Sequence, residues 1–86
     1  MKLVIVKQAQ GKYLFKVPNG YSVAAGDILM LNTQNGSTTG IAMCDSFCAN
    51  NDIAEDIMRS FGTQEKSMKY VTGKGTYTMF DIETEA

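Results

Sequence analysis

The two cysteines are the most reactive side chains of this chain, and they lie in the segment Cys44-Asp45-Ser46-Phe47-Cys48. A zinc site needs four ligands, mostly Cys or His, and the chain has two cysteines and no histidine. The spacing also differs from the Cys-x-x-Cys spacing of thiol redox pairs. In an extended strand these two positions lie about 13 Å apart, beyond the ~7 Å that a disulfide spans. We therefore expect reduced cysteines that pack as small apolar residues, no metal and no cofactor.

Carboxylates are the second candidate for chemistry. The absence of histidine excludes Ser-His and Cys-His nucleophile pairs. Paired carboxylates for acid-base catalysis would have to come from Asp27, Asp45, Asp52, Glu55 and Asp56. Most of these have a structural explanation as a turn residue, a helix cap, an ion-pair partner or part of a solvated helix face. We predict no catalytic residue and no enzymatic activity.

Lysines beside tyrosines are the third candidate, because small barrels bind single-stranded nucleic acid with exposed aromatic rings and scattered cations. The candidate nucleic-acid-binding residues are Lys12, Lys16, Lys69, Tyr70, Lys74 and Tyr77. The net charge of −1 and the single arginine oppose this reading. Nucleic-acid binding is therefore the alternative hypothesis and not the leading one.

The length and composition are those of one folded domain covering residues 1–86. Apolar residues make up 44% of the chain and charged residues 20%, both ordinary values for a globular domain. The longest purely apolar runs are Leu3–Val6 and Ile28–Leu31, whereas a membrane-spanning helix needs about 20 residues. We expect a cytoplasmic protein that does not contact a membrane.

One helix is predicted over residues 51–61. Asp52 and Glu55 form a variant of the capping box, with Asn51 as the alternative cap, and Gly62 ends the helix. Glu55 and Arg59 form an i,i+4 ion pair on the outer face. The apolar stripe that should face the core consists of Ile53, Ala54, Ile57, Met58 and Phe61.

Strands and turns account for the rest of the chain. Residues 3–8 and 12–17 form a hairpin around Ala9-Gln10-Gly11, and Pro18-Asn19-Gly20 is a turn. A strand over 28–33 and its return over 37–44 are joined at Asn35-Gly36, a strong hairpin signal. Gly40 within the return strand predicts a bulge or a bend. The last strands are expected over 68–72 and 76–82, separated by Gly73-Lys74-Gly75.

These elements predict an α+β domain with a small, highly curved, mostly antiparallel sheet or open β-barrel of five to six strands. The helix at about 51–61 must pack on the sheet, because a three-turn helix is too short to be stable alone. The predicted sheet core is Leu3, Ile5, Phe15, Val17, Ile28, Met30, Ile41, Val71 and Phe80.

The order of features from Tyr13 to Ala42 resembles a recurrent bacterial module. The features are Val17-Pro18, then Gly26-Asp27-Ile28-Leu29-Met30-Leu31-Asn32-Thr33, then Asn35-Gly36, then Thr39-Gly40-Ile41-Ala42. They are similar to the Gly-Asp-x-Val-x-Val-x-Thr…Gly…x-Gly-x-Val pattern of small SH3-like or OB-like barrels. The chain looks most like short uncharacterised bacterial or prophage proteins in which a helix and a last strand follow the barrel. The basic residues that nucleic-acid-binding barrels place near the Gly-Asp corner are replaced here by Ala24, Ala25 and Gln34.

The leading functional hypothesis is a non-enzymatic interaction or accessory module. Edge strands of a small sheet recruit extended partners or self-associate. We expect an unknown protein partner or self-association through an edge strand.

Overall fold

The structure is a computed structural model that describes residues 1–33, 36–75 and 78–79. Its elements in chain order are β1 (Lys2–Gln8), β2 (Gly11–Lys16), β3 (Ile28–Thr33), β4 (Gly36–Ala42), β5 (Phe47–Cys48), α1 (Asn51–Ser60), the 3₁₀ turn η1 (Glu65–Ser67), β6 (Val71–Lys74) and β7 (Thr78–Met79). Six strands follow the path β2-β1-β4-β3-β6-β7, and β5 pairs with β1 beside this path. The α+β class, the antiparallel sheet and the single packed helix are confirmed for the part of the chain that is described.

Both predicted hairpins are confirmed. In the β1–β2 pair, Leu3 lies opposite Lys16 at one end and Gln8 lies opposite Gly11 at the other. In the β3–β4 pair, Ile28 lies opposite Ile41 and Thr33 lies opposite Gly36. The strand predicted over 68–72 is β6, Val71–Lys74, so Gly73 and Lys74 lie within the strand instead of after it. Of the strand predicted over 76–82, only Thr78–Met79 falls within the described residues.

Gly40 marks a close approach between the neighbouring strands β1 and β4. The β3–β4 register runs regularly through Gly40, so the predicted bulge at this residue is wrong; the irregular register lies between Met30 and Leu31, where β3 meets β6. A Cβ atom on Gly40 would overlap the Val6 side chain and lie 3.0 Å from the Lys7 carbonyl oxygen. Glycine is therefore needed here because β1 approaches β4 closely beside their short antiparallel pairing.

The inner cluster is the main hydrophobic core of the sheet. Its buried members are Val4, Val6, Phe15, Val17, Val23, Leu29, Leu31, Ala42 and Val71. The prediction was wrong for Ile28 and Ile41, which are 50% and 51% exposed and lie opposite each other on β3 and β4. Met30 is half-buried. Ile28 to Leu31 are all apolar, so alternation alone did not indicate which face is buried.

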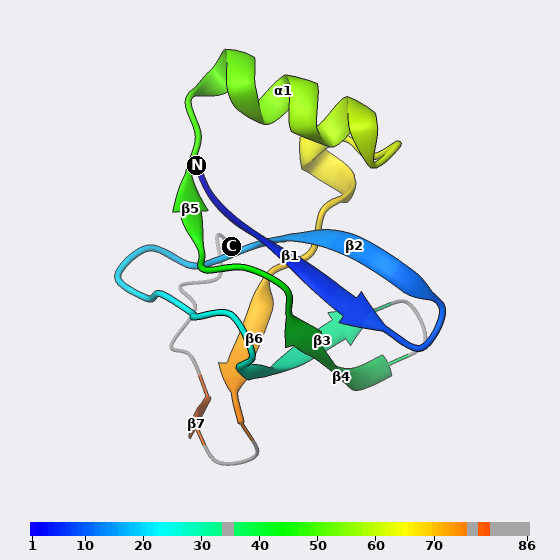
Figure 1. The fold of residues 1–86 in the computed structure, drawn as a ribbon, viewed down its shortest axis with the longest axis vertical. Helices are drawn as coiled ribbons and strands as arrows, with labels where there is room; N and C mark the ends of the chain where they lie inside the picture. The colour runs from blue at the N-terminus through cyan, green and yellow to red at the C-terminus, as the bar shows by residue number, and fades with distance from the viewer. Residues whose placement is uncertain (34–35, 76–77, 80–86) are drawn as a thin grey trace.

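The helix-side cluster is a second, smaller core between α1 and the first hairpin. Its buried members are Leu3, Leu14, Ala49, Ala54 and Met68, and Ile5, Phe47, Ile57, Met58 and Phe61 pack against them. Figure 1 shows α1 above β1 and β2, on the side away from β3 and β4. The first hairpin therefore buries both of its faces. Phe80, predicted for the core, lies outside the described residues.

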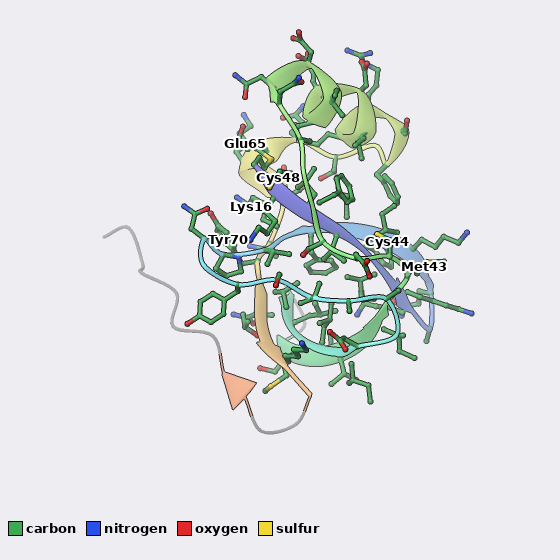
Figure 2. All side chains as sticks on the ribbon, turned by 60° about the vertical axis from the view of Figure 1, so that its left-hand side comes forward. Lys16, Met43, Cys44, Cys48, Glu65 and Tyr70 are labelled. Carbon is green, nitrogen blue, oxygen red and sulfur yellow. The ribbon has the colours of Figure 1, made fainter. Side chains whose placement is uncertain are left out.

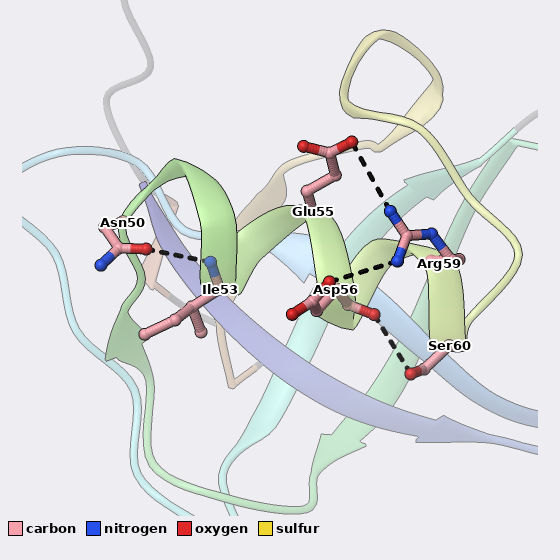
Figure 3. Close-up of polar contacts among 6 residues, drawn as sticks. All are labelled: Asn50, Ile53, Glu55, Asp56, Arg59 and Ser60. Atoms are coloured by element: carbon pink, nitrogen blue, oxygen red, sulfur yellow. Dashed lines mark hydrogen bonds and ion pairs between the residues drawn. The ribbon is translucent and has the colours of Figure 1, made fainter.

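The helix begins at Asn51, as predicted, but its N-cap is Asn50. The Asn50 side-chain oxygen accepts a hydrogen bond from the Ile53 amide at 2.9 Å, as Figure 3 shows, so the predicted caps at Asp52 and Asn51 are wrong. Ile53 is 53% exposed rather than buried, and Ala54 is the buried residue of this turn. The helix ends at Ser60, and Gly62, with φ of +67°, follows its C-cap Phe61 as the predicted helix end. No helix among the described residues has the length and apolar character to cross a membrane.

Candidate functional site

The outer edge of β2 is the starting point of the candidate site. β2 stands at one end of the strand path. The Val17 amide donates to the Lys2 carbonyl at 2.9 Å, whereas the Lys16 amide points away from β1 and donates to the Lys69 carbonyl at 3.0 Å. Main-chain groups alternate in direction along an antiparallel strand, so those of Lys12 and Leu14 also point away from β1.

Only the last residue of β2 has a strand neighbour on this outer side, within the residues that the structure describes. Lys16 forms a single parallel bridge with Tyr70. The outward N–H and C=O groups of Lys12 and Leu14 join no described strand. An edge of this kind is a template for one more strand.

An open groove of about 600 Å³ runs along this edge, and we call it the β2 groove. Its lining residues are Gln8, Gln10, Tyr13, Leu14, Phe15, Gly36, Ser37, Thr38, Phe61, Thr63, Ser67, Met68 and Lys69. They come from the end of β1 and the turn after it, β2, the start of β4, the residues just after α1 and the segment that leads into β6. Leu14, Phe61 and Met68 form an apolar floor beside hydroxyl and amide groups, and Lys69 is the one charged residue among the described residues of this lining.

A contact between Lys16 and Tyr70, which we call the clasp, lies next to the groove residues Phe15 and Lys69. The Lys16 Nζ atom lies 4.5 Å from the centre of the Tyr70 ring, which is cation–π distance, and 3.5 Å from the Glu65 carbonyl oxygen. Figure 2 labels these three residues, which gather at one corner of the molecule. The clasp therefore joins the end of β2 to the chain on either side of Met68.

The structure brings together only part of the predicted nucleic-acid set. Lys16, Lys69 and Tyr70 are neighbours in the clasp. Lys12 lies at the other end of β2, opposite Lys7. Lys74 forms an ion pair of 3.1 Å with Asp27. Tyr77 lies outside the described residues.

Asp27 is a turn residue, as predicted. Its Oδ2 atom accepts a hydrogen bond from the Ala24 amide at 2.8 Å. This backbone hydrogen bond lowers the pKa of Asp27 below its usual value; partial burial opposes the shift, and Lys74 adds to it. These contacts stabilise the ionised carboxylate in the loop.

Three of the other four candidate carboxylates have structural partners, and Asp52 lies exposed in the first turn of α1. Asp45 accepts a hydrogen bond from the Ala25 amide at 2.9 Å. Glu55 and Asp56 lie 3.7 Å and 3.2 Å from the Arg59 guanidinium, both on the exposed face that Figure 3 shows. The described residues contain no group of three or more His, Cys, Asp or Glu side chains that would hold a metal ion.

Both cysteines are free thiols, in agreement with the prediction. Cys44 is half-buried and packs against the inner cluster. Cys48 is exposed on β5, opposite Lys2, so the prediction of packed small residues holds only for Cys44. Figure 2 shows the two side chains at separate places on the molecule.

The sequence did not indicate the β2 groove. Phe61, Met68 and Thr38 are far apart in the chain and meet only in the folded protein. One signal was present: Leu14 stands between Lys12 and Lys16 on an otherwise polar face of its strand. That pattern indicated a second apolar contact for the hairpin.

Comparison of the chain with protein-family models, with curated proteins and with solved structures finds no match.

Proposed function

We propose that this protein is a non-enzymatic interaction module that accepts an extended peptide segment along the outer edge of β2. The observation that carries the proposal is the coincidence of an edge with unjoined main-chain groups at Lys12 and Leu14 and a groove beside it. Main-chain hydrogen bonds would supply affinity, and contacts with alternate side chains would supply specificity.

The chemistry of the lining supports an extended segment over a compact ligand. A strand added to β2 would turn one set of side chains toward Leu14, Phe61 and Met68. It would turn the alternate set toward polar residues such as Ser37 and Thr38. An apolar residue flanked by polar or acidic residues suits this arrangement.

A selection from a random heptapeptide library displayed on phage tests the proposal. The selected peptides should bind the wild-type protein, and Lys12→Pro should weaken them about tenfold because it removes an outward amide and adds a ring at the edge. Lys12→Ala is the matched control, because it removes the same charge but keeps the amide. Equal losses in both variants would mean that the side chain, and not the strand edge, is recognised.

We also propose that the curved sheet is a small barrel of the SH3-like or OB-like kind. The support is the parallel bridge between Lys16 and Tyr70, which connects the end of β2 to the start of β6. A barrel of this kind would keep the β2 groove as its incomplete seam. We further propose a cytoplasmic location, which the two free cysteines support.

The alternative function is single-stranded nucleic-acid binding through Lys12, Lys16, Lys69, Tyr70, Lys74 and Tyr77. The clustering of Lys16, Lys69 and Tyr70 favours it. Two observations oppose it: Lys16 covers one face of the Tyr70 ring, and Lys74 is paired with Asp27. Titration of a labelled oligonucleotide at two salt concentrations separates the hypotheses. Salt-sensitive binding at micromolar protein would favour the nucleic-acid function.

A further inference from the structure

We infer that the β2 groove is built to hold the C-terminal segment of a second copy of this chain, residues 80–86. The inference rests on the proposed function and names the occupant. The segment reads Phe-Asp-Ile-Glu-Thr-Glu-Ala and lies outside the described residues.

Alternation in this segment matches the chemistry of the groove. Phe80 and Ile82 alternate with Asp81, Glu83 and Glu85. In an extended conformation the two kinds of side chain point to opposite faces. The apolar face fits the floor formed by Leu14, Phe61 and Met68, and the acidic face fits the hydroxyl groups of Tyr13, Ser37 and Thr38.

Charge complementarity points the same way. Residues 1–79 hold all eight Lys and Arg residues but only six of the nine Asp and Glu residues, and residues 80–86 hold the other three acids. The groove lining contains Lys69 and, among the described residues, no carboxylate. Lys12 adds a second cation on the edge itself. Acidic segments are attracted to such a site.

The clasp explains why the segment comes from a second copy. β7 pairs with β6 at Gly73 and Lys74, beyond the point where Tyr70 meets Lys16. The groove lies on the other side of that point, along residues 11–15 of β2. Met79, opposite Gly73, therefore lies on the far side of the clasp from the groove, whereas a segment from another molecule would enter from the open side. Reciprocal exchange of two such segments closes a two-fold dimer.

Sedimentation velocity of the full chain over a concentration series is the test. The wild-type protein should form dimers. Phe80→Ser combined with Ile82→Ser, and separately Lys12→Pro, should each raise the dimer dissociation constant about tenfold or more. Lys12→Ala keeps the edge amide and should stay much closer to wild type than Lys12→Pro.

A mixture of the two disabled variants gives a sharper result. The Phe80→Ser/Ile82→Ser protein keeps an intact groove, and the Lys12→Pro protein keeps an intact segment. The mixture should form heterodimers more readily than either variant forms homodimers. Asp81→Asn with Glu83→Gln should weaken the wild-type dimer and reduce its salt dependence, which keeps the test valid if the apolar substitutions disturb folding.

Three outcomes would overturn the inference. Dimers unaffected by every one of these variants would place the interface elsewhere. A monomer whose Lys12 and Leu14 amides lose protection on Phe80→Ser/Ile82→Ser would mean that the chain fills its own groove. A monomer with exposed Lys12 and Leu14 amides that still binds the selected heptapeptides would refute the second copy as the occupant and leave the proposed function standing. If the heptapeptides also fail to bind at β2, the proposed function fails too.

Discussion

Gly40 shows how one residue permits two neighbouring strands, β1 and β4, to approach closely. Its missing side chain leaves room for Val6, the Lys7 carbonyl and Leu31, which lies 3.1 Å from the position that a Cβ atom would occupy. Gly40→Ala should therefore reduce the free energy of unfolding by about 1–3 kcal/mol, the usual cost of overpacking. Chemical denaturation measures this, with Thr39→Ala on the exposed face as control. A loss at Gly40 no larger than that of the control would contradict this close approach.

Asp27 gives a pH-dependent prediction at the same scale. Its pKa is lowered in the folded protein from an ordinary value of 3.8, so its contribution to stability is present above that value. The contribution is lost as the pH falls through the lower, folded pKa. Asp27→Asn should therefore be less stable than wild type at pH 6, and the difference should shrink below pH ~4. Urea denaturation from pH 2 to pH 7 checks this; a constant difference would contradict it.

At the scale of elements, α1 is held by its cap and by its contact with the first hairpin. The Asn50 side chain satisfies the Ile53 amide, so Asn50→Ala should reduce the free energy of unfolding by ~0.5–2 kcal/mol. Asn51→Ala is the matched control, since Asn51 lies within the helix and is exposed. Thermal or urea unfolding of both variants decides the cap. A larger loss at Asn51 would restore the cap that the sequence suggested.

Local signals in the sequence predicted the strands and the helix well. Which side chains are buried and where the β2 groove lies depend on packing between residues far apart in the chain. The turn residues around Gly11 and the hairpin at Gly36 predicted the strand pairs. The i,i+4 pattern predicted the position of α1 and also predicted that Ile53 is buried. In the structure Ala54 packs in the helix-side cluster and Ile53 is exposed. The face of β3 could not be read from four consecutive apolar residues. The β2 groove depends on Phe61 and Met68 meeting β2, which only the folded chain brings about.

At the scale of the whole molecule, the outer edge of β2 is joined to the chain that leads into β6, within the described residues, only where Lys16 meets Tyr70. This contact is the clasp. Tyr70→Ala should make the Lys16 amide, which donates to the Lys69 carbonyl, exchange faster with solvent. Residue-resolved hydrogen exchange would show this. Unchanged exchange at Lys16 would mean that the clasp does not hold the two segments together.

The most direct test of the central claim is residue-resolved hydrogen exchange along β2, measured with and without a saturating selected heptapeptide in a Phe80→Ser/Ile82→Ser background. The backbone amides of Tyr13 and Phe15 point toward β1 and should exchange slowly in both samples. The outward amides of Lys12 and Leu14 should exchange quickly alone and slow strongly when the peptide is bound, because a new strand then covers them. If these two amides are already slow without the peptide, or stay fast while the peptide is bound, the outer edge of β2 is not the site that accepts a partner.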